Sequence, residues 1–138
     1  MRGIVLVLLL TISQLGMAQT ISVFYNNQAS IIPNIQTTKI KQFKVQYYNL
    51  DQLQMVMNIM NKKLSGSDSE LAYNNAQLLI NHYRPEIKHA VKGLNLAQRY
   101  HISMVPTVVF NQGQYIIKNQ ANIFMAIDQY RQWSERHA

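Results

Sequence analysis

The stretch from Tyr100 to Tyr115, YHISMVPTVVFNQGQY, constrains the fold more than any other part of the chain. Val108 to Phe110 is a short apolar run that contains β-branched and aromatic residues, which is typical of a buried strand. Asn111-Gln112-Gly113 is a turn signal, and residues 114–117 return to a strand pattern, so we predict a β-hairpin. The chain enters this hairpin through an X-Pro step at Pro106.

Two further strands are predicted in the first half of the chain. Apolar side chains recur at alternate positions from Thr20 to Tyr25, and again from Phe43 to about Leu50. This period of two indicates half-buried strands. The segment from Asn26 to Thr38 between them is polar and is interrupted by Ile31-Ile32-Pro33.

Two helices should follow. The period changes to that of a helix after Asp51, which we predict as the N-cap. A second helix should begin at the S-x-x-E capping box of Ser67 to Glu70 and run to about Tyr100. Pro85 lacks a backbone donor and disfavours helical geometry at the residue before it, so we expect a kink or a restart near Arg84.

A last helix is predicted from about Asn119, because five apolar residues share one face of it and can pack on a sheet. They are Ile123, Ala126, Ile127, Tyr130 and Trp133. The resulting order β-β-α-α-β-β-α predicts an α/β fold, in which helices flank a sheet.

The N-terminus resembles a cleavable secretory signal. Arg2 precedes the apolar run Ile4 to Leu10, and Gly16-Met17-Ala18 places small residues before Gln19. The run is shorter than the roughly 20 apolar residues that a spanning helix needs. We therefore predict a signal peptide over residues 1–18, cleavage after Ala18 and a single domain over residues 19–138 in the periplasm, with no stable membrane span. A buried N-terminal strand is the alternative.

The chain has no cysteine, which excludes thiol–disulfide exchange. Its formal net charge of +7 would suit contact with DNA, anionic lipid or cell-wall polymers. The lysines and arginines are scattered along the sequence, however, and such charge is usually solvated surface. We expect no dedicated nucleic-acid site.

No group of side chains has the spacing of a catalytic or metal site. Met55 and Met57 point about 200° apart on a helix, so they cannot share a copper ion, and we predict Met57 and Met60 as core residues. The four histidines lack the spacing of zinc ligands. They are His82, His89, His101 and His137. With no nucleophile elbow, phosphate loop or carboxylate cluster, we predict no catalytic residue, no metal and no cofactor, and we do not expect an enzyme.

The hairpin stretch resembles the region around the cis-proline of thioredoxin-fold proteins, where Tyr100, Ile102, Pro106-Thr107 and Gly113 fall at matching spacing. The resemblance implies a thioredoxin-like sheet flanked by helices, without the redox cysteines, and a cis Val105-Pro106 bond. A cis-proline beside an open sheet edge exposes backbone that can pair with an extended peptide. Val105, Pro106 and Thr107 are therefore implied as partner-binding residues; a purely architectural bend is the alternative.

Nearly all of the chain after the signal also resembles a family of small exported proteins that integrating conjugative elements and conjugation gene clusters encode. The matching segments, besides the signal peptide, are Val23-Phe24, Tyr48 to Asp51, Ile102, Val105 to Phe110 and Ala126 to Arg131. The resemblance implies an accessory or assembly protein of a conjugative (type IV secretion) DNA-transfer system.

Such a protein would act by contact with other exported components of the transfer apparatus, without redox catalysis. Two alternatives stay open: a non-redox folding factor of the envelope, and a basic envelope protein that contacts DNA or anionic lipid. The sequence does not determine the oligomeric state.

Overall fold

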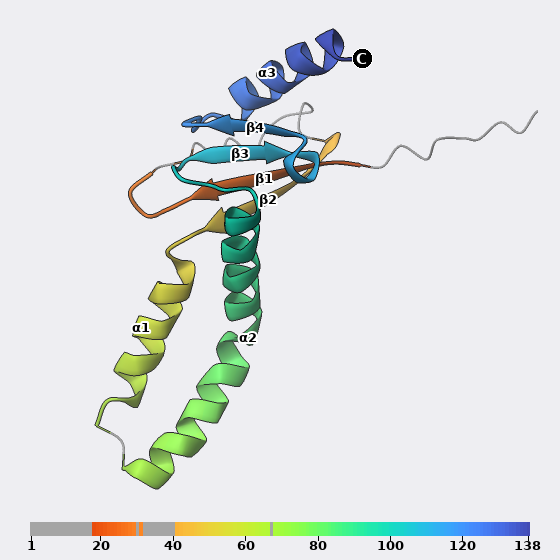
Figure 1. Cartoon of the computed structure of the whole chain (residues 1–138). Coiled ribbons are helices and arrows are strands. Elements are labelled where there is room, and N and C mark those ends of the chain that lie inside the picture. The colour runs from red at the N-terminus through yellow and green to blue at the C-terminus, as the bar shows by residue number, and fades with distance from the viewer. Residues whose placement is uncertain (1–17, 30, 32–40, 67) are drawn as a thin grey trace, which may run out of the picture.

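The computed structural model describes residues 18–29, 31, 41–66 and 68–138. In them the chain forms a mixed α/β fold, a four-stranded sheet flanked by helices (Figure 1). The elements are β1 (Gln19–Tyr25), β2 (Phe43–Asn49), α1 (Gln52–Leu64), α2 (Ser69–Arg99), β3 (Thr107–Phe110), the short 3-10 helix η1 (Asn111–Gly113), β4 (Tyr115–Lys118) and α3 (Ile123–Arg136). This order confirms the predicted one. Residues 1–17 of the expected signal peptide lie outside the described residues, and no described helix is long and apolar enough to cross a membrane.

The strands lie in the order β2-β1-β3-β4. β1 runs parallel to β2, with Phe24 opposite Tyr48, and antiparallel to β3, with Phe24 opposite Thr107. β3 and β4 form the predicted hairpin, with Val108 opposite Ile117. β3 therefore lies inside the sheet, and β2 and β4 form its edges.

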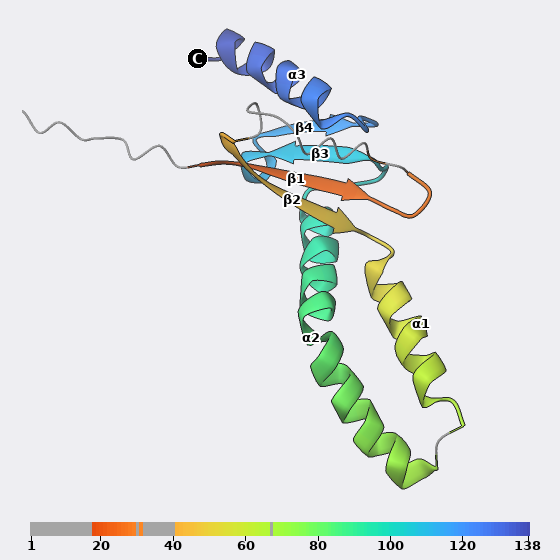
Figure 2. The ribbon, with the colours of Figure 1, turned by 180° about the vertical axis from the view of Figure 1, so that it is seen from behind.

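Helix α3 covers one face of the sheet, and the C-terminal part of α2 meets the other (Figures 1 and 2). On the α3 side, Ile127 packs with strand residues such as Ile21 and Val108, and the rings of Phe110 and Tyr130 stack with centroids 4.5 Å apart. Stacked aromatic pairs of this kind contribute about 0.5–1.5 kcal/mol beyond their buried area. A smaller cluster on the α2 side contains Phe24, Tyr48, Ala97 and Val109.

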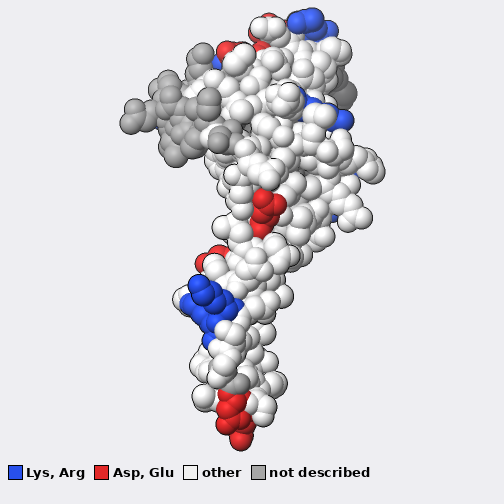
Figure 3. Space-filling view, turned by 90° about the vertical axis from the view of Figure 1, so that its left-hand side faces the viewer, with Lys and Arg blue, Asp and Glu red and all other residues white. Residues whose placement is uncertain are grey.

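Helices α1 and α2 form a hairpin that projects away from the sheet (Figures 1 and 2). We call α1 together with residues 69–86 of α2 the arm, and the rest of the described chain the body. Val56 and Met60 are the buried residues of α1. In Figure 3 the arm is a narrow column below the body, and most of its visible surface belongs to uncharged residues.

The predicted break near Arg84 takes the form of a bend. Helix α2 continues through Pro85 without restarting, and its axis changes direction about half-way along in both ribbon views. Proline is a common cause of such bends, because its nitrogen cannot donate the helical hydrogen bond. The expected kink is therefore confirmed.

Three helix predictions need correction. Helix α2 begins at Ser69 with Asp68 as its N-cap, so the capping box that starts at Ser67 is wrong; Ser67 itself lies outside the described residues. Met57, predicted in the core, is 44% exposed, because it lies on the outer side of α1, whereas Met60 is buried as predicted.

Helix α3 begins at Ile123 and not at Asn119. Asn119 adopts a left-handed conformation, with φ 56°, which is incompatible with a right-handed helix. The helix starts where Asn122 supplies the cap, since its side-chain oxygen accepts hydrogen bonds from the backbone N–H groups of Phe124 and Met125. The predicted apolar face is confirmed: four of its five residues are buried, and Trp133 packs against them.

Candidate functional site

The carboxyl ends of β1 and β2 carry a group of hydrogen-bonded polar side chains centred on Asn27. The backbone N–H of Asn27 donates to Oδ2 of Asp51 at 3.0 Å. Its side-chain oxygen accepts from Nδ2 of Asn49 at 2.8 Å, and its own Nδ2 lies 3.2 Å from the Met55 sulfur. This arrangement ties the turn after β1 to the start of α1.

The turn itself is an Asx turn. Oδ1 of Asn26 accepts from the backbone N–H groups of Gln28 and Ala29, at 3.2 and 2.7 Å. Asp51 stands at the N-cap of α1 as predicted, but its side chain makes no capping bond, because its carboxylate accepts from Asn27 instead. The group consists of amides and one carboxylate, which can orient a ligand by hydrogen bonds but offer no nucleophile.

The X-Pro step lies at the same end of the sheet. The Val105-Pro106 bond is cis, as expected. Pro106 and Thr107 are buried, and Thr107 donates its hydroxyl to the Met104 carbonyl at 2.7 Å. Val105 is half-buried, whereas Met104 beside it is 49% exposed.

This geometry reduces the number of predicted peptide-binding residues, Val105, Pro106 and Thr107, that a partner could contact. The expected open edge is absent at Thr107, because β3 pairs with β1 on one side and with β4 on the other. A partner at this step would therefore contact Val105 and the exposed Met104, which the sequence argument did not name. A role of these residues in partner binding stays a prediction.

The structure does not bring the four histidines together, and the described residues contain no group of three or more His, Asp or Glu side chains placed to hold a metal. His89 stacks on Tyr48, with ring centroids 4.9 Å apart, and its Nε2 lies 2.8 Å from the Tyr47 carbonyl oxygen. His137 packs on Trp133 at the end of α3. His82 lies on the arm, and His101 follows α2.

One phenol is electrostatically perturbed. Burial, and secondly the nearby Tyr25, raise the pKa of Tyr47 above its ordinary value of 10.0. Desolvation disfavours the charged form of a phenol, so Tyr47 stays neutral at physiological pH. It therefore supplies no phenolate nucleophile.

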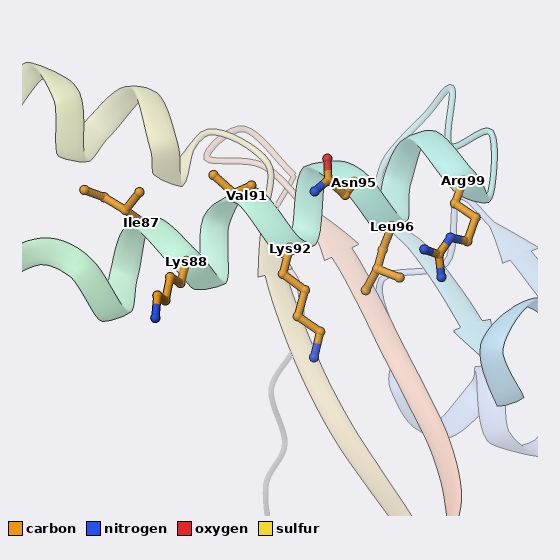
Figure 4. A pocket seen from close by; sticks show the side chains of 7 residues that line it. All are labelled: Ile87, Lys88, Val91, Lys92, Asn95, Leu96 and Arg99. Carbon is orange, nitrogen blue, oxygen red and sulfur yellow. The ribbon is translucent and has the colours of Figure 1, made fainter.

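The body also contains a groove of about 510 Å³ along the C-terminal part of α2 (Figure 4). Its lining residues are Ile87, Lys88, Val91, Lys92, Asn95, Leu96 and Arg99. A second hollow of about 180 Å³ adjoins it at Lys92 and is lined also by Thr20, Ile21, Ser22, Lys44 and Gln46. These basic residues look scattered along the sequence, and the groove was not predicted from it. The spacing of Lys88, Lys92 and Arg99, at intervals of four and seven residues on one predicted helix, was the available signal.

A protein-family model described as "Protein of unknown function (DUF1525)" matches residues 22–136. Comparison with curated proteins and with solved structures found no match.

Proposed function

The chain belongs to the DUF1525 family, whose description gives no function. We propose that it is an exported accessory or assembly protein of a conjugative DNA-transfer (type IV secretion) system. It acts by contact with other exported components of that apparatus, without redox catalysis. Its place is the periplasm, after removal of residues 1–18. The conjugative setting comes from the sequence resemblance, and the mode of action comes from the geometry of the arm.

The exposed apolar side chains of the arm carry the proposal. Leu71 and Leu78 are 57% and 68% exposed and, seven positions apart, lie on one face of the first turns of α2. Tyr73, 67% exposed, lies about 200° from Leu71 on the opposite face. Large apolar side chains gathered on one part of a surface mark sites of protein contact. An arm that projects from a well-packed body presents them to a partner without disturbing the core.

The polar group at the sheet end supports a binding role over a catalytic one. Asn27, Asn49 and Asp51 are engaged with one another and with backbone, and the turn region carries no cysteine or histidine. The proposed fold is thioredoxin-like. The parallel β1-β2 pair and the antiparallel β3-β4 hairpin that joins beside β1 support this assignment.

The proposal predicts that deleting the gene lowers conjugative transfer of its host element and that the wild-type protein supplied in trans restores it. The decisive variant is Leu71→Ser/Leu78→Ser, which removes two exposed apolar side chains from the arm. The matched control is Met125→Ser, because Met125 is 53% exposed but lies on α3. Mating frequency is measured for each strain, and protein level is checked by immunoblot.

We expect the arm variant to accumulate normally and to fail to restore transfer, while the α3 control restores it. Unchanged transfer in the deletion strain would remove the conjugative role. Full restoration by the arm variant would leave that role standing and exclude the arm as the contact surface. The two parts of the proposal are thus tested separately.

A further inference from the structure

The groove along α2 and the adjoining hollow meet at Lys92, which lines both. We call this surface the corner groove. One wall is the C-terminal part of α2, and the other is the sheet face beside it. Side chains alternate along a strand, so Lys44 and Gln46 lie on the same face of β2 as Tyr48, against which α2 packs.

The corner groove is positively charged. Four of its lining side chains are basic: Lys44, Lys88, Lys92 and Arg99. All six acidic residues of the chain lie in its described part, and none lines either hollow. The nearest in sequence is Glu86, but residues two apart on a helix do not face each other, so Glu86 does not neutralise Lys88.

Apolar side chains are interleaved with these cations. Ile87, Val91 and Leu96 line the same groove; in Figure 4 Ile87 and Val91 project from one side of the helix, and Leu96 projects from the other side together with Lys88, Lys92 and Arg99. The three cations of α2 thus form a row with apolar side chains beside it. The groove therefore offers two kinds of contact to one ligand.

The dimensions suit a short segment of chain. Lys88 and Arg99 are eleven positions apart, which corresponds to roughly 16 Å along a helix at about 1.5 Å per residue. An extended peptide of about five residues covers that length at about 3.3 Å per residue.

The lining residues also discriminate between classes of anionic partner. Single-stranded nucleic acid is usually held by aromatic side chains that stack on the bases, and neither hollow is lined by an aromatic residue. Peripheral contact with a bilayer favours a projecting surface with apolar side chains that insert, whereas this surface is a concave corner. A peptide that contains both acidic and apolar residues matches the positive charge and the apolar lining of the groove.

We propose that the corner groove binds a short, acidic and partly apolar segment of a protein partner, with carboxylates on Lys88, Lys92 and Arg99 and apolar side chains beside Val91 and Leu96. This inference rests on the proposed function only in so far as that function requires a protein partner. It adds the chemistry of the partner and a second contact surface, separate from the arm.

The test measures binding of a fluorescein-labelled probe peptide, Gly-Ser-Glu-Leu-Asp-Val-Glu-Leu-Asp-Ser-Gly, to the purified protein by fluorescence anisotropy. A second peptide carries Gln and Asn in place of Glu and Asp. The groove variant is Lys88→Glu/Lys92→Glu. Its matched control is Lys62→Glu/Lys118→Glu, which changes the net charge equally at exposed positions outside both hollows. Circular dichroism checks that both variants fold.

We expect the acidic peptide to bind and its affinity to fall as salt is added. The groove variant should bind it about tenfold or more weakly than the wild type, and the control variant less than about twofold more weakly. Three results would overturn the inference: no binding of the acidic peptide, equal losses in both variants, or equal binding of the neutral peptide. Tighter binding of a thymidine 20-mer or of phosphatidylglycerol vesicles, abolished by the groove variant alone, would overturn it in favour of a phosphate ligand. Because no transfer assay is involved, none of these outcomes depends on the conjugative role.

Discussion

Helix α3 and the outer part of α2 have similar apolar patterns, but the apolar face is buried in α3 and exposed in α2. Ile123, Ala126 and Ile127 of α3 are buried against the sheet, whereas Leu71 and Leu78 of α2 are mostly exposed. Helical spacing of apolar residues thus predicts a helix in both places. It does not predict whether another element of the same chain covers the face.

The orientation of each helix on the sheet explains the difference. Helix α3 packs across the sheet, so its apolar face is buried along much of its length, whereas α2 meets the opposite face only through its C-terminal part (Figures 1 and 2). The buried residues of α2 are Ala90, Gly93 and Ala97, all small, and Gly93 and Ala97 lie against strand residues. Small side chains let α2 approach the sheet closely. The larger apolar residues of α2 lie further from the sheet, on the arm.

Truncation of one buried and one exposed apolar side chain distinguishes the buried face of α3 from the exposed face of the arm. Ile127→Ala should lower the free energy of unfolding by about 2–5 kcal/mol, because it removes a fully buried side chain and leaves a cavity. Leu78→Ala, an equivalent truncation on the arm, should change it by less than about 0.5 kcal/mol, because Leu78 is mostly solvated. Urea denaturation followed by circular dichroism measures both.

A large loss of stability in Leu78→Ala would break the comparison, since it would mean that the tip of the arm is covered, for example by a second copy. Repeating the measurement over a range of protein concentration separates that case, because stability then depends on concentration.

The second prediction concerns the contact between α2 and the sheet. A Cβ at Gly93 would lie 2.8 Å from Cδ1 and 3.1 Å from Cγ of Tyr48, and that ring is itself stacked between Phe24 and His89. Gly93→Ala should cost about 1–3 kcal/mol by overpacking, offset by a gain of up to about 1 kcal/mol in helix propensity. We expect a net destabilisation of about 1 kcal/mol in urea denaturation.

A double-mutant cycle sharpens this test. In a Tyr48→Ala background the two close ring atoms are absent and only the Cβ of residue 48, 3.0 Å away, remains, so Gly93→Ala should cost much less than in the wild-type background. If Gly93→Ala destabilises both backgrounds equally, the cost does not come from contact with Tyr48, and α2 is not packed on the sheet as described.

Much of the body could be predicted from the sequence because its signals are local. Alternation at Ile21, Val23 and Tyr25, the turn at Asn111 to Gly113 and the apolar face of α3 each depend on a few neighbouring residues. The start of α3 was misplaced because Asn119 and Asn122 are both plausible caps. The choice between them depends on backbone dihedrals that the turn from β4 imposes.

The candidate sites could be predicted less well, because they depend on long-range contacts. Asp51 fits an N-cap by sequence, but its carboxylate accepts from Asn27, which lies 24 positions away. The corner groove combines residues of β1, β2 and α2. Lys44 joins Lys88, Lys92 and Arg99 there only when α2 docks beside β2.

The last prediction concerns the pH dependence of stability and compares a phenol in the body with one on the arm. Burial raises the pKa of Tyr47, so the folded state holds this proton more tightly than the unfolded state does. The resulting stabilisation is fully present below the unfolded pKa of about 10 and is lost as pH rises through the folded value. Tyr47→Phe removes the ionisation. It should therefore reduce the loss of unfolding free energy measured by urea denaturation between about pH 9 and about pH 11.

Tyr73→Phe is the matched control, because it removes the same hydroxyl from a side chain that is 67% exposed on the arm. Its stability should fall with pH as steeply as that of the wild type. If the unfolding free energy of Tyr47→Phe falls with pH as steeply as that of the wild type, burial in the body does not disfavour the Tyr47 phenolate.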